Sequence, residues 1–262
     1  MSSFEIIPGD AQSTVILHVP HSSTFIPADV RAGIVLTDEE LAAELAAITD
    51  AHTDIIAAGA ADQAGVRPWS FVNRTSRLVI DPERFPDERE ELNAVGMGAV
   101  YEKTTRQTTL RTPTTEERAD LIERFFNPYS EGIAALVRER LAAVGKVTII
   151  DVHSFPVNHS AYELHKTDAR PELCIGTDIF HTPATLLELT REAMRPATPT
   201  GDIENDQPFK GCYVPLDQYG SNAAVQAVML EIRRDVVSSN MGGLQTATAT
   251  LIDAIENSDR TT

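Results

Sequence analysis

The segment at residues 146–155 (KVTIIDVHSF) joins a run of apolar and β-branched residues to two polar side chains. Residues 147–150 (VTII) have the composition of a strand that is buried on both faces of a sheet. Asp151 and His153 follow two positions apart, so their side chains point the same way on an extended backbone. Because ligands bind beyond the carboxyl ends of strands in open α/β sheets, the segment predicts a functional site at its end. The alternative is that Asp151 caps a helix and that His153 is a hydrogen-bonded surface residue.

The rest of the chain alternates segments typical of buried strands with segments typical of helices. The other expected strands lie at residues 13–19, 66–72, 77–80, 172–176 and 223–232. The expected helices lie at residues 37–64 with a break near Thr49, 115–145 with an interruption at Pro128, 183–195 and 243–257. This alternation predicts an α/β fold with a mostly parallel (mixed) sheet, helices on both faces and a single domain over residues 1–262. Residues 81–114 are too long for a plain connector, so we expect a lid-like functional loop with short helices.

Charge and cysteine content narrow the classes of function. The 262-residue chain has a formal net charge of −17 and a pI of about 4.7, so its surface repels the phosphate backbone of nucleic acids. Cys174 and Cys212 lie in apolar stretches without zinc-finger spacing, which predicts free thiols in a reducing cytoplasm. The chain shows no signal segment and no apolar run of about 18 residues, so we expect a cytoplasmic protein without a membrane anchor.

Three segments offer histidine or carboxylate groups for a metal ion. They are His21 after the first expected strand, Asp50-x-His52-x-Asp54 near the helix break, and Asp151-x-His153. Catalytic zinc commonly takes three protein ligands and leaves one position for water, which two histidines and one carboxylate would satisfy. In a regular helix Asp50 and Asp54 share a face from which His52 points away, and the choice between the two carboxylates stays open. We expect His18 to be a hydrogen-bonded core residue, and His159, His165 and His181 to be exposed.

Glu231 is the only ionisable residue in the late strand expected at residues 223–232. A carboxylate in an apolar run is costly unless it is paired or used in chemistry. Beside a metal ion, Glu231 would be suited to take a proton from water as a general base. The alternative is a surface glutamate at the end of the strand.

Arginines gather in the middle of the chain, where they suggest recognition of carboxylates in an otherwise acidic protein. They are Arg74, Arg77, Arg84, Arg106 and Arg111. The alternative is that they form salt bridges with neighbouring acidic residues such as Asp81 and Glu83.

An ordered set of motifs resembles the N-formylglutamate amidohydrolase (N-formylglutamate deformylase) family. The matching stretches are VPHSSTFIP at 19–27, TDAHTD at 49–54, SRLVIDPER at 76–84, IIDVHSF at 149–155, CIGT at 174–177, NDQPFKGCYV at 205–214 and AVQAVMLEIRRD at 224–235. The resemblance implies a fold like that of the zinc carboxypeptidases and hydrolysis of a formamide on glutamate. It also implies that His21 and His153 are zinc ligands and that Glu231 is the catalytic glutamate.

The chain departs from these patterns at three places. His21 is followed by Ser-Ser-Thr, whereas zinc carboxypeptidases have His-x-x-Glu, so the carboxylate ligand must come from elsewhere and Asp50 is our choice. Glu83 stands where the family pattern suggests asparagine, and the segment KTTRQTTLR at residues 103–111 also differs. These departures bear on the substrate more than on the chemistry.

Together with these residues, the resemblance implies a zinc-dependent hydrolase that cleaves N-formyl-L-glutamate to formate and L-glutamate, as in histidine degradation. One Zn²⁺ per chain would be held by His21, Asp50 and His153, with Glu231 as the base. The residues expected to bind the dicarboxylate N-acyl substrate are Arg77, Arg84, Asn205 and Lys210. The alternatives are a zinc peptidase or amidase acting on another N-acyl amino acid or small peptide, and a non-catalytic ligand-binding relative. A serine hydrolase using Ser22 or Ser154 is disfavoured because no Gly-x-Ser-x-Gly motif exists. Both a monomer and a small homo-oligomer remain open.

Overall fold

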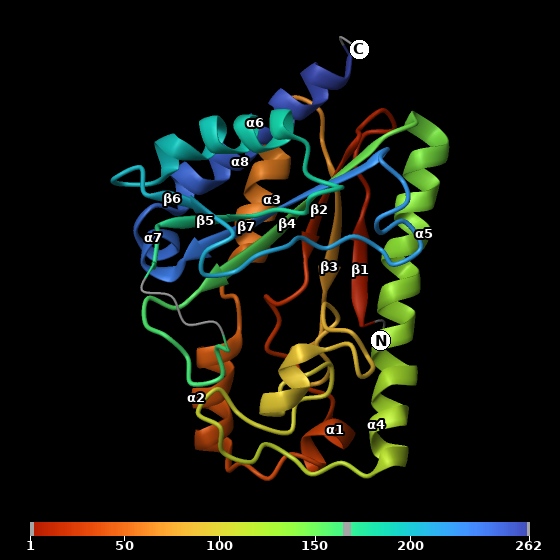
Figure 1. The fold of residues 1–262 in the computed structure, drawn as a ribbon, viewed down its shortest axis with the longest axis vertical. Helices are drawn as coiled ribbons and strands as arrows, with labels where there is room; N and C mark the ends of the chain where they lie inside the picture. Colours follow the sequence, from red (N-terminus) through yellow and green to blue (C-terminus); the bar gives the residue numbers. More distant parts are fainter. Residues whose placement is uncertain (1–2, 165–168, 261–262) are drawn as a thin grey trace.

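The structure, a computed structural model, describes residues 3–164 and 169–260. Its centre is a seven-stranded sheet with the strand order β1-β3-β2-β4-β7-β5-β6 (Figure 1). The strands are β1 (Phe4–Ile7), β2 (Val15–Val19), β3 (Trp69–Asn73), β4 (Val147–Phe155), β5 (Leu173–Gly176), β6 (Ile203–Asn205) and β7 (Val225–Arg233). The neighbours β3, β2, β4 and β7 are parallel, while β1 pairs antiparallel with β3 and β5 pairs antiparallel with β7. This confirms the predicted mostly parallel, mixed sheet.

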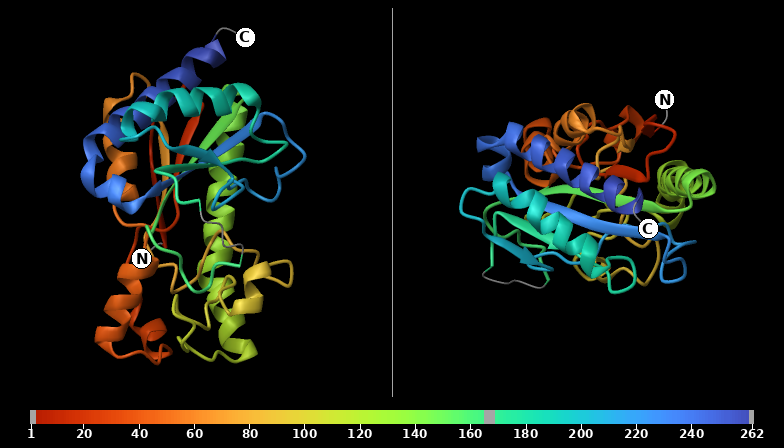
Figure 2. Two further views of the ribbon diagram at one scale, coloured as in Figure 1. Left: turned by 60° about the vertical axis from the view of Figure 1, so that its left-hand side comes forward. Right: turned by 90° about the horizontal axis from the view of Figure 1, so that it is seen from above.

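Helices cover both faces of the sheet, as the alternating sequence pattern predicts. The helices are α1 (Ala28–Ala32), α2 (Asp38–Ile48), α3 (Thr53–Gln63), α4 (Thr115–Leu121), α5 (Asn127–Val144), α6 (Ala184–Met194), α7 (Arg234–Ser239) and α8 (Met241–Arg260). On one face, α3, α6 and α8 pack against Leu17 and Leu230. On the other face, α5 packs against Ile16 and Ile149, because successive residues of a strand point to opposite sides. The view from above shows the sheet between these two layers (Figure 2).

A second packed region lies below the sheet in Figure 1, beyond the carboxyl ends of the parallel strands. It contains α1, α2, α4 and residues 81–114, the segment predicted as a lid-like loop. This segment holds a short 3₁₀ helix, Glu91–Val95. Its residues Leu92, Met97 and Leu110 are buried in an apolar core that is separate from the sheet and is shared with α2. The segment is therefore anchored by apolar packing where it approaches the end of the sheet.

Several local predictions need correction. Residues 77–80 form a turn rather than a strand, although Leu78, Val79 and Ile80 are buried as their apolar character suggests. The expected helix at residues 115–145 stays helical throughout, with a π-helical turn at Ile122–Phe126 between α4 and α5.

Two edge strands, β1 and β6, were absent from the predictions because both are short and lie among irregular residues. The predicted helix break near Thr49 is confirmed, since α2 ends there and α3 starts after an intervening turn. None of the helices in residues 3–164 and 169–260 is both long and apolar enough to cross a membrane.

Candidate active site

Neighbouring parallel strands deliver four ionisable side chains to one end of the sheet. His18 near the end of β2 is the register partner of Asp151 on β4. His153 on β4 is the register partner of Glu231 on β7. His21 lies just beyond the end of β2, where Pro20 interrupts the strand. The carboxyl ends of the parallel strands therefore carry the predicted histidines and glutamate, in the position where ligands bind in α/β sheets.

Asp50 reaches this group from the turn between α2 and α3. Within this turn, His52 adopts a left-handed backbone conformation with a φ of 70°. The backbone N–H of Asp50 donates a hydrogen bond to the carbonyl of His21, which fixes the turn beside the end of β2. The Asp50 Oδ2 atom lies 3.0 Å from His153 Nδ1 and 3.6 Å from His21 Nδ1, and the two ring nitrogens are 3.3 Å apart. Asp54, the other candidate carboxylate, instead accepts a hydrogen bond from the backbone N–H of Ile55 and borders a separate, smaller cavity.

These three donor atoms fit a metal ion of zinc's size. A tetrahedral ion with bonds of about 2.0–2.1 Å holds its ligand atoms roughly 3.3–3.4 Å apart. The observed separations of 3.0, 3.3 and 3.6 Å bracket that spacing. Two imidazoles and one carboxylate also form a donor set that zinc accepts in catalytic sites. The residues present are therefore compatible with one metal ion held by His21, Asp50 and His153.

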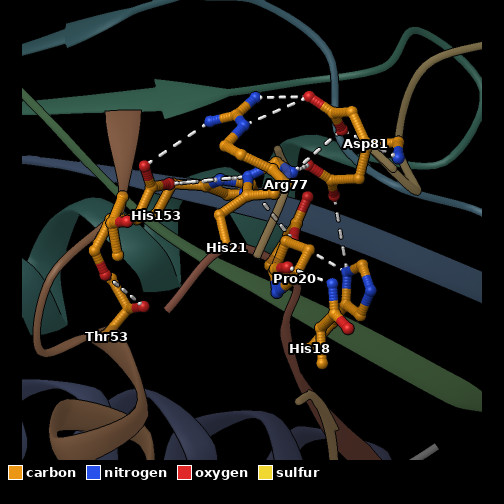
Figure 3. A network of polar contacts seen from close by, with 12 residues as sticks. His18, Pro20, His21, Thr53, Arg77, Asp81 and His153 are labelled. Carbon is orange, nitrogen blue, oxygen red and sulfur yellow. Dashed lines mark hydrogen bonds and ion pairs between the residues drawn. The ribbon is translucent and has the colours of Figure 1, made fainter. Parts of the chain in front are cut away.

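A buried network behind His21 fixes the orientation of its ring. His21 Nε2 lies 3.0 Å from Asp81 Oδ1, and Asp81 Oδ2 accepts hydrogen bonds from Arg77 Nη2 at 2.6 Å and from the Tyr101 hydroxyl at 2.5 Å (Figure 3). Burial alone would raise the pKa of Asp81, but Arg77 and His21 hold it well below its usual value. An ionised carboxylate on the far nitrogen sets the tautomer of a ligating histidine and raises its basicity, so Asp81 leaves Nδ1 free for a metal.

A second set of polar atoms lies on the other side of His153. His153 Nε2 is 2.9 Å from Asp151 Oδ1 and 3.3 Å from Glu83 Oε2. His18 Nδ1 is also 2.9 Å from Asp151 Oδ1, while its Nε2 contacts the Tyr129 hydroxyl at 2.6 Å. Burial lowers the pKa of His153, but Asp151 and Glu83 outweigh it and hold the pKa well above its usual value.

Glu231 is buried beside the histidines, and its Oε2 atom has no hydrogen-bond partner among the described residues. Burial raises the pKa of Glu231 to about 8. A carboxyl group with a strongly raised pKa at the edge of a cavity is a candidate for a functional role. Glu231 thus combines an unpaired oxygen with a proton affinity near neutral pH.

The site opens into a cavity of about 860 Å³. His21, Asp50, His153 and Glu231 line it, as do the basic residues Arg77, Arg84, Lys210 and Arg234. The aromatic residues Phe85, Phe126, Phe155, Tyr162, Phe209, Tyr213 and Tyr219 form much of the remaining wall. A concave site with apolar walls and a few converging polar groups is typical of small-molecule binding.

Residues 13–238 match the N-formylglutamate amidohydrolase family. The chain belongs to that family. The crystal structure of an N-formylglutamate amidohydrolase from Ralstonia eutropha JMP134 is similar, with a TM-score of 0.80, 23% identity, and coverage of 100% of this chain and 99% of that one. A gene product from Agrobacterium tumefaciens matches with a TM-score of 0.71, 19% identity, and coverage of 100% of this chain and 96% of the other. At these identities the solved structures support the fold, while the family match carries the assignment. None of the curated proteins compared with the chain matches it in sequence.

The predicted substrate-binding residues of this amidohydrolase lie in different environments. Arg77 is buried and engaged with Asp81 and Tyr101. Arg84 lines the cavity, is 29% exposed, and has an Nε atom without a hydrogen-bond partner among the described residues. Lys210 also lines the cavity and is exposed. Asn205 lies outside the cavity lining, and its Oδ1 accepts a hydrogen bond from Arg191 Nη2 at 2.6 Å.

The other histidines of the amidohydrolase were predicted with mixed success. His18 is a hydrogen-bonded core residue, and His159 is exposed beside Glu163, as expected. His181 was predicted to be exposed and is wholly buried, because its Nδ1 contacts the carbonyl of Val225 and its Nε2 accepts from Gly220 N–H. His165 lies outside the described residues.

Two further observations concern residues outside the predicted constellation. Ser154 Oγ is buried without a hydrogen-bond partner among the described residues, so no base is positioned to activate it as a nucleophile. Asp81 and Glu83 were not predicted to approach the histidines. The sequence did offer one clue to the position of Asp81. It follows Arg77 by four residues, a spacing at which oppositely charged side chains often pair across one turn of the backbone.

Proposed function

We propose that this family member hydrolyses N-formyl-L-glutamate to formate and L-glutamate, with one Zn²⁺ held by His21, Asp50 and His153. The observation that carries the proposal is the spacing of these three donor atoms, between 3.0 and 3.6 Å, next to the buried carboxyl group of Glu231. The same end of the sheet opens into the cavity that would hold the substrate. Membership of the amidohydrolase family supports the reaction class.

A zinc ion held by these residues would act as a Lewis acid that lowers the pKa of water and polarises an amide carbonyl. Glu231 would take the proton from the attacking water and deliver it to the nitrogen of the leaving amino acid. Its unpaired Oε2 atom and its position opposite His153 support this role. Asp81 would hold His21 in the tautomer that presents Nδ1, and Arg77 would keep Asp81 ionised.

We propose that Arg84 and Lys210 make the first contacts with the carboxylates of the substrate. Both line the cavity, and Arg84 is less occupied by protein partners than Arg77, whose Nε and Nη2 atoms already donate to Asp81. The remaining Arg77 group, Nη1, lies 3.6 Å from Asp50 Oδ1 and faces the reacting end of the cavity. Asn205 is left out of this proposal, because it does not line the cavity and its Oδ1 accepts a hydrogen bond from Arg191.

A second substrate class has one observation in its favour. Glu83, which precedes Arg84 in the sequence, also lines the cavity. It adds a negative charge to the region where the two carboxylates of N-formylglutamate would bind. An N-acyl amino acid with an uncharged side chain would meet less repulsion there. A role in histidine degradation and a cytoplasmic location remain predictions that depend on the substrate being N-formylglutamate.

The test is a substrate panel assayed on zinc-loaded and chelator-treated protein. N-formylglutamate, N-formylglutamine and N-acetylglutamate vary the side-chain charge and the acyl group one at a time. We expect N-formylglutamate to have the highest kcat/KM, and expect chelation to remove activity until zinc is returned. Preference for N-formylglutamine would transfer the proposal to the uncharged class, and full activity in metal-free protein would overturn the metal-dependent mechanism.

A further inference from the structure

Glu83 lies on the side of the His21 and His153 rings that points away from Asp50. Its Oε2 atom is 3.3 Å from His153 Nε2 and 3.6 Å from His21 Nε2, whereas Asp50 contacts the Nδ1 atoms of both rings. Its Oε1 atom is 3.5 Å from His18 Nδ1 and has no hydrogen-bond partner among the described residues. Glu83, His18 and Asp151 therefore form a second group of donors within 4.8 Å of one another, separate from the proposed zinc ligands.

The second group has the spacing and the chemistry of a metal site. His18 Nδ1 and Asp151 Oδ1 are 2.9 Å apart, and His18 Nδ1 and Glu83 Oε1 are 3.5 Å apart. Ligand atoms around an ion with bonds of about 2.0–2.1 Å lie at such separations. One imidazole with two carboxylates is a donor set that suits Zn²⁺ and Mn²⁺.

The residues behind the second group hold its donors in place. The Tyr129 hydroxyl, 2.6 Å from His18 Nε2, can accept the Nε2 proton and so leave the Nδ1 lone pair facing Asp151 and Glu83. The backbone N–H of Tyr213 donates to Asp151 Oδ2, which directs Asp151 Oδ1 into the group.

An oxygen without a hydrogen bond also points into the second group. The Glu83 Oε1 atom is buried, and no donor among the described residues satisfies it. Buried polar atoms are nearly always satisfied, so an unpaired carboxylate oxygen beside His18 and Asp151 indicates that a cation belongs nearby.

We propose that this chain holds a second divalent cation between His18, Asp151 and Glu83. The second site lies on the side of His153 away from Asp50. The proposal concerns metal binding alone, so it does not depend on the substrate.

The test counts metal ions in metal-free protein that is reloaded with excess Zn²⁺ and desalted, using elemental analysis. The variants are Glu83→Asn and His18→Gln, and the control is Glu91→Gln, which changes a carboxylate that borders the cavity but belongs to neither group. We expect two zinc ions per chain in the parent and in Glu91→Gln, and one in Glu83→Asn and His18→Gln. Circular dichroism on the same samples reports whether each variant is folded.

A second readout loads the protein with Mn²⁺, desalts it, and counts the ions by electron paramagnetic resonance after acid release. The parent should hold two Mn²⁺ per chain, and Glu83→Asn should hold one. A parent that saturates at one zinc overturns the proposal, as does a folded Glu83→Asn variant that keeps two zinc ions or loses both. If the parent saturates at one zinc and still hydrolyses N-formylglutamate, the second site is excluded and the proposed function stands.

Discussion

His153 and Glu231 are register partners and lie side by side on the adjacent parallel strands β4 and β7. Parallel pairing brings a proposed metal ligand and the proposed base to the same level at the carboxyl end of the sheet. Glu231 is buried there with an unpaired Oε2 atom, an arrangement that costs stability. Such a cost is typical of a residue that serves chemistry rather than folding.

The first prediction separates these two roles of a buried glutamate. Glu231→Gln keeps the shape of the side chain but cannot accept a proton, so kcat should fall by about 10²–10⁴-fold. Zinc content should persist, and the thermal midpoint should stay or rise because no hydrogen bond to Oε2 is lost. The measurement is kcat, bound zinc and thermal midpoint on one sample.

Glu256 supplies the matched control for that experiment. It is also buried, but its Oε1 atom accepts hydrogen bonds from the Ser13 hydroxyl at 2.7 Å and the Thr14 N–H at 2.9 Å, far from the cavity. Glu256→Gln should lower the thermal midpoint and leave kcat unchanged. A kcat for Glu231→Gln within a few-fold of the parent would show that Glu231 is not the base.

The second prediction compares Asp50 with Asp54. Asp50→Asn should weaken zinc binding and reduce hydrolysis, because it replaces the carboxylate that lies 3.0 Å from His153 Nδ1 by a neutral amide. Asp54→Asn should retain the zinc affinity of the parent, since Asp54 contacts the backbone of Ile55 instead. Zinc affinity is measured by competition with a chromophoric chelator, and equal affinities in the two variants would exclude Asp50 as a ligand.

The third prediction concerns the buried ion pair behind His21. Arg77→Ala leaves the Asp81 carboxylate buried without its main partner, so we expect a loss of about 3–5 kcal/mol in the free energy of unfolding. Arg74→Ala removes an exposed pair with Glu5 and should cost about 1 kcal/mol or less. Urea denaturation of both variants measures the difference, and similar losses would contradict a structural role for Arg77.

The strands that carry the site were largely predictable, because their apolar runs are long and end abruptly at ionisable residues. The run at residues 147–150 and the single glutamate at position 231 both correspond to features of real strands. Their convergence required only the rule that parallel strands end at the same edge of a sheet.

The parts that failed depend on contacts between distant residues. The sequence of residues 77–80 (RLVI) suggests a strand, but the segment forms a turn. Leu78 packs in the apolar core below the sheet, and Arg77 donates a hydrogen bond to Asp81. His181 lies in a loop-like stretch, yet backbone groups 39 and 44 residues away satisfy both of its nitrogens. Helical periodicity left the choice between Asp50 and Asp54 open, because it does not reveal the left-handed backbone of His52 that precedes α3.

The fourth prediction concerns the two cysteines, which are free thiols in the structure. Burial raises the pKa of the Cys174 thiol to about 12 and also raises the pKa of Cys212. Because only the thiolate reacts, at pH 8 about one Cys174 side chain in 10⁴ is reactive. Native protein should therefore resist iodoacetamide while urea-unfolded protein reacts at both positions. Mass spectrometry after timed quenching checks this, and rapid labelling of folded protein would contradict it.

The last prediction concerns recognition of the substrate's carboxylates by Arg84. Its guanidinium group borders the cavity. The Nε atom is 3.6 Å from Asp81 Oδ2, which is too far for a hydrogen bond, so the group retains donors for a substrate carboxylate.

Arg84→Ala should raise KM for N-formylglutamate by about ten-fold or more, the effect of losing a charge-assisted hydrogen bond of about 1.5–3 kcal/mol. The change in kcat should be smaller, because a contact remote from the amide is equally strong in the ground and transition states.

Two comparisons isolate the charge in this experiment. Arg84→Lys should recover part of the loss, since lysine keeps the charge but loses the paired geometry of guanidinium. Arg74→Ala removes an arginine that pairs with Glu5 outside the cavity, and its KM should equal that of the parent. Steady-state kinetics with N-formylglutamate and N-formylglutamine decide the matter. If Arg84→Ala raises KM equally for both substrates, Arg84 binds the α-carboxylate, which they share, and if KM is unchanged for both, Arg84 is not a substrate contact.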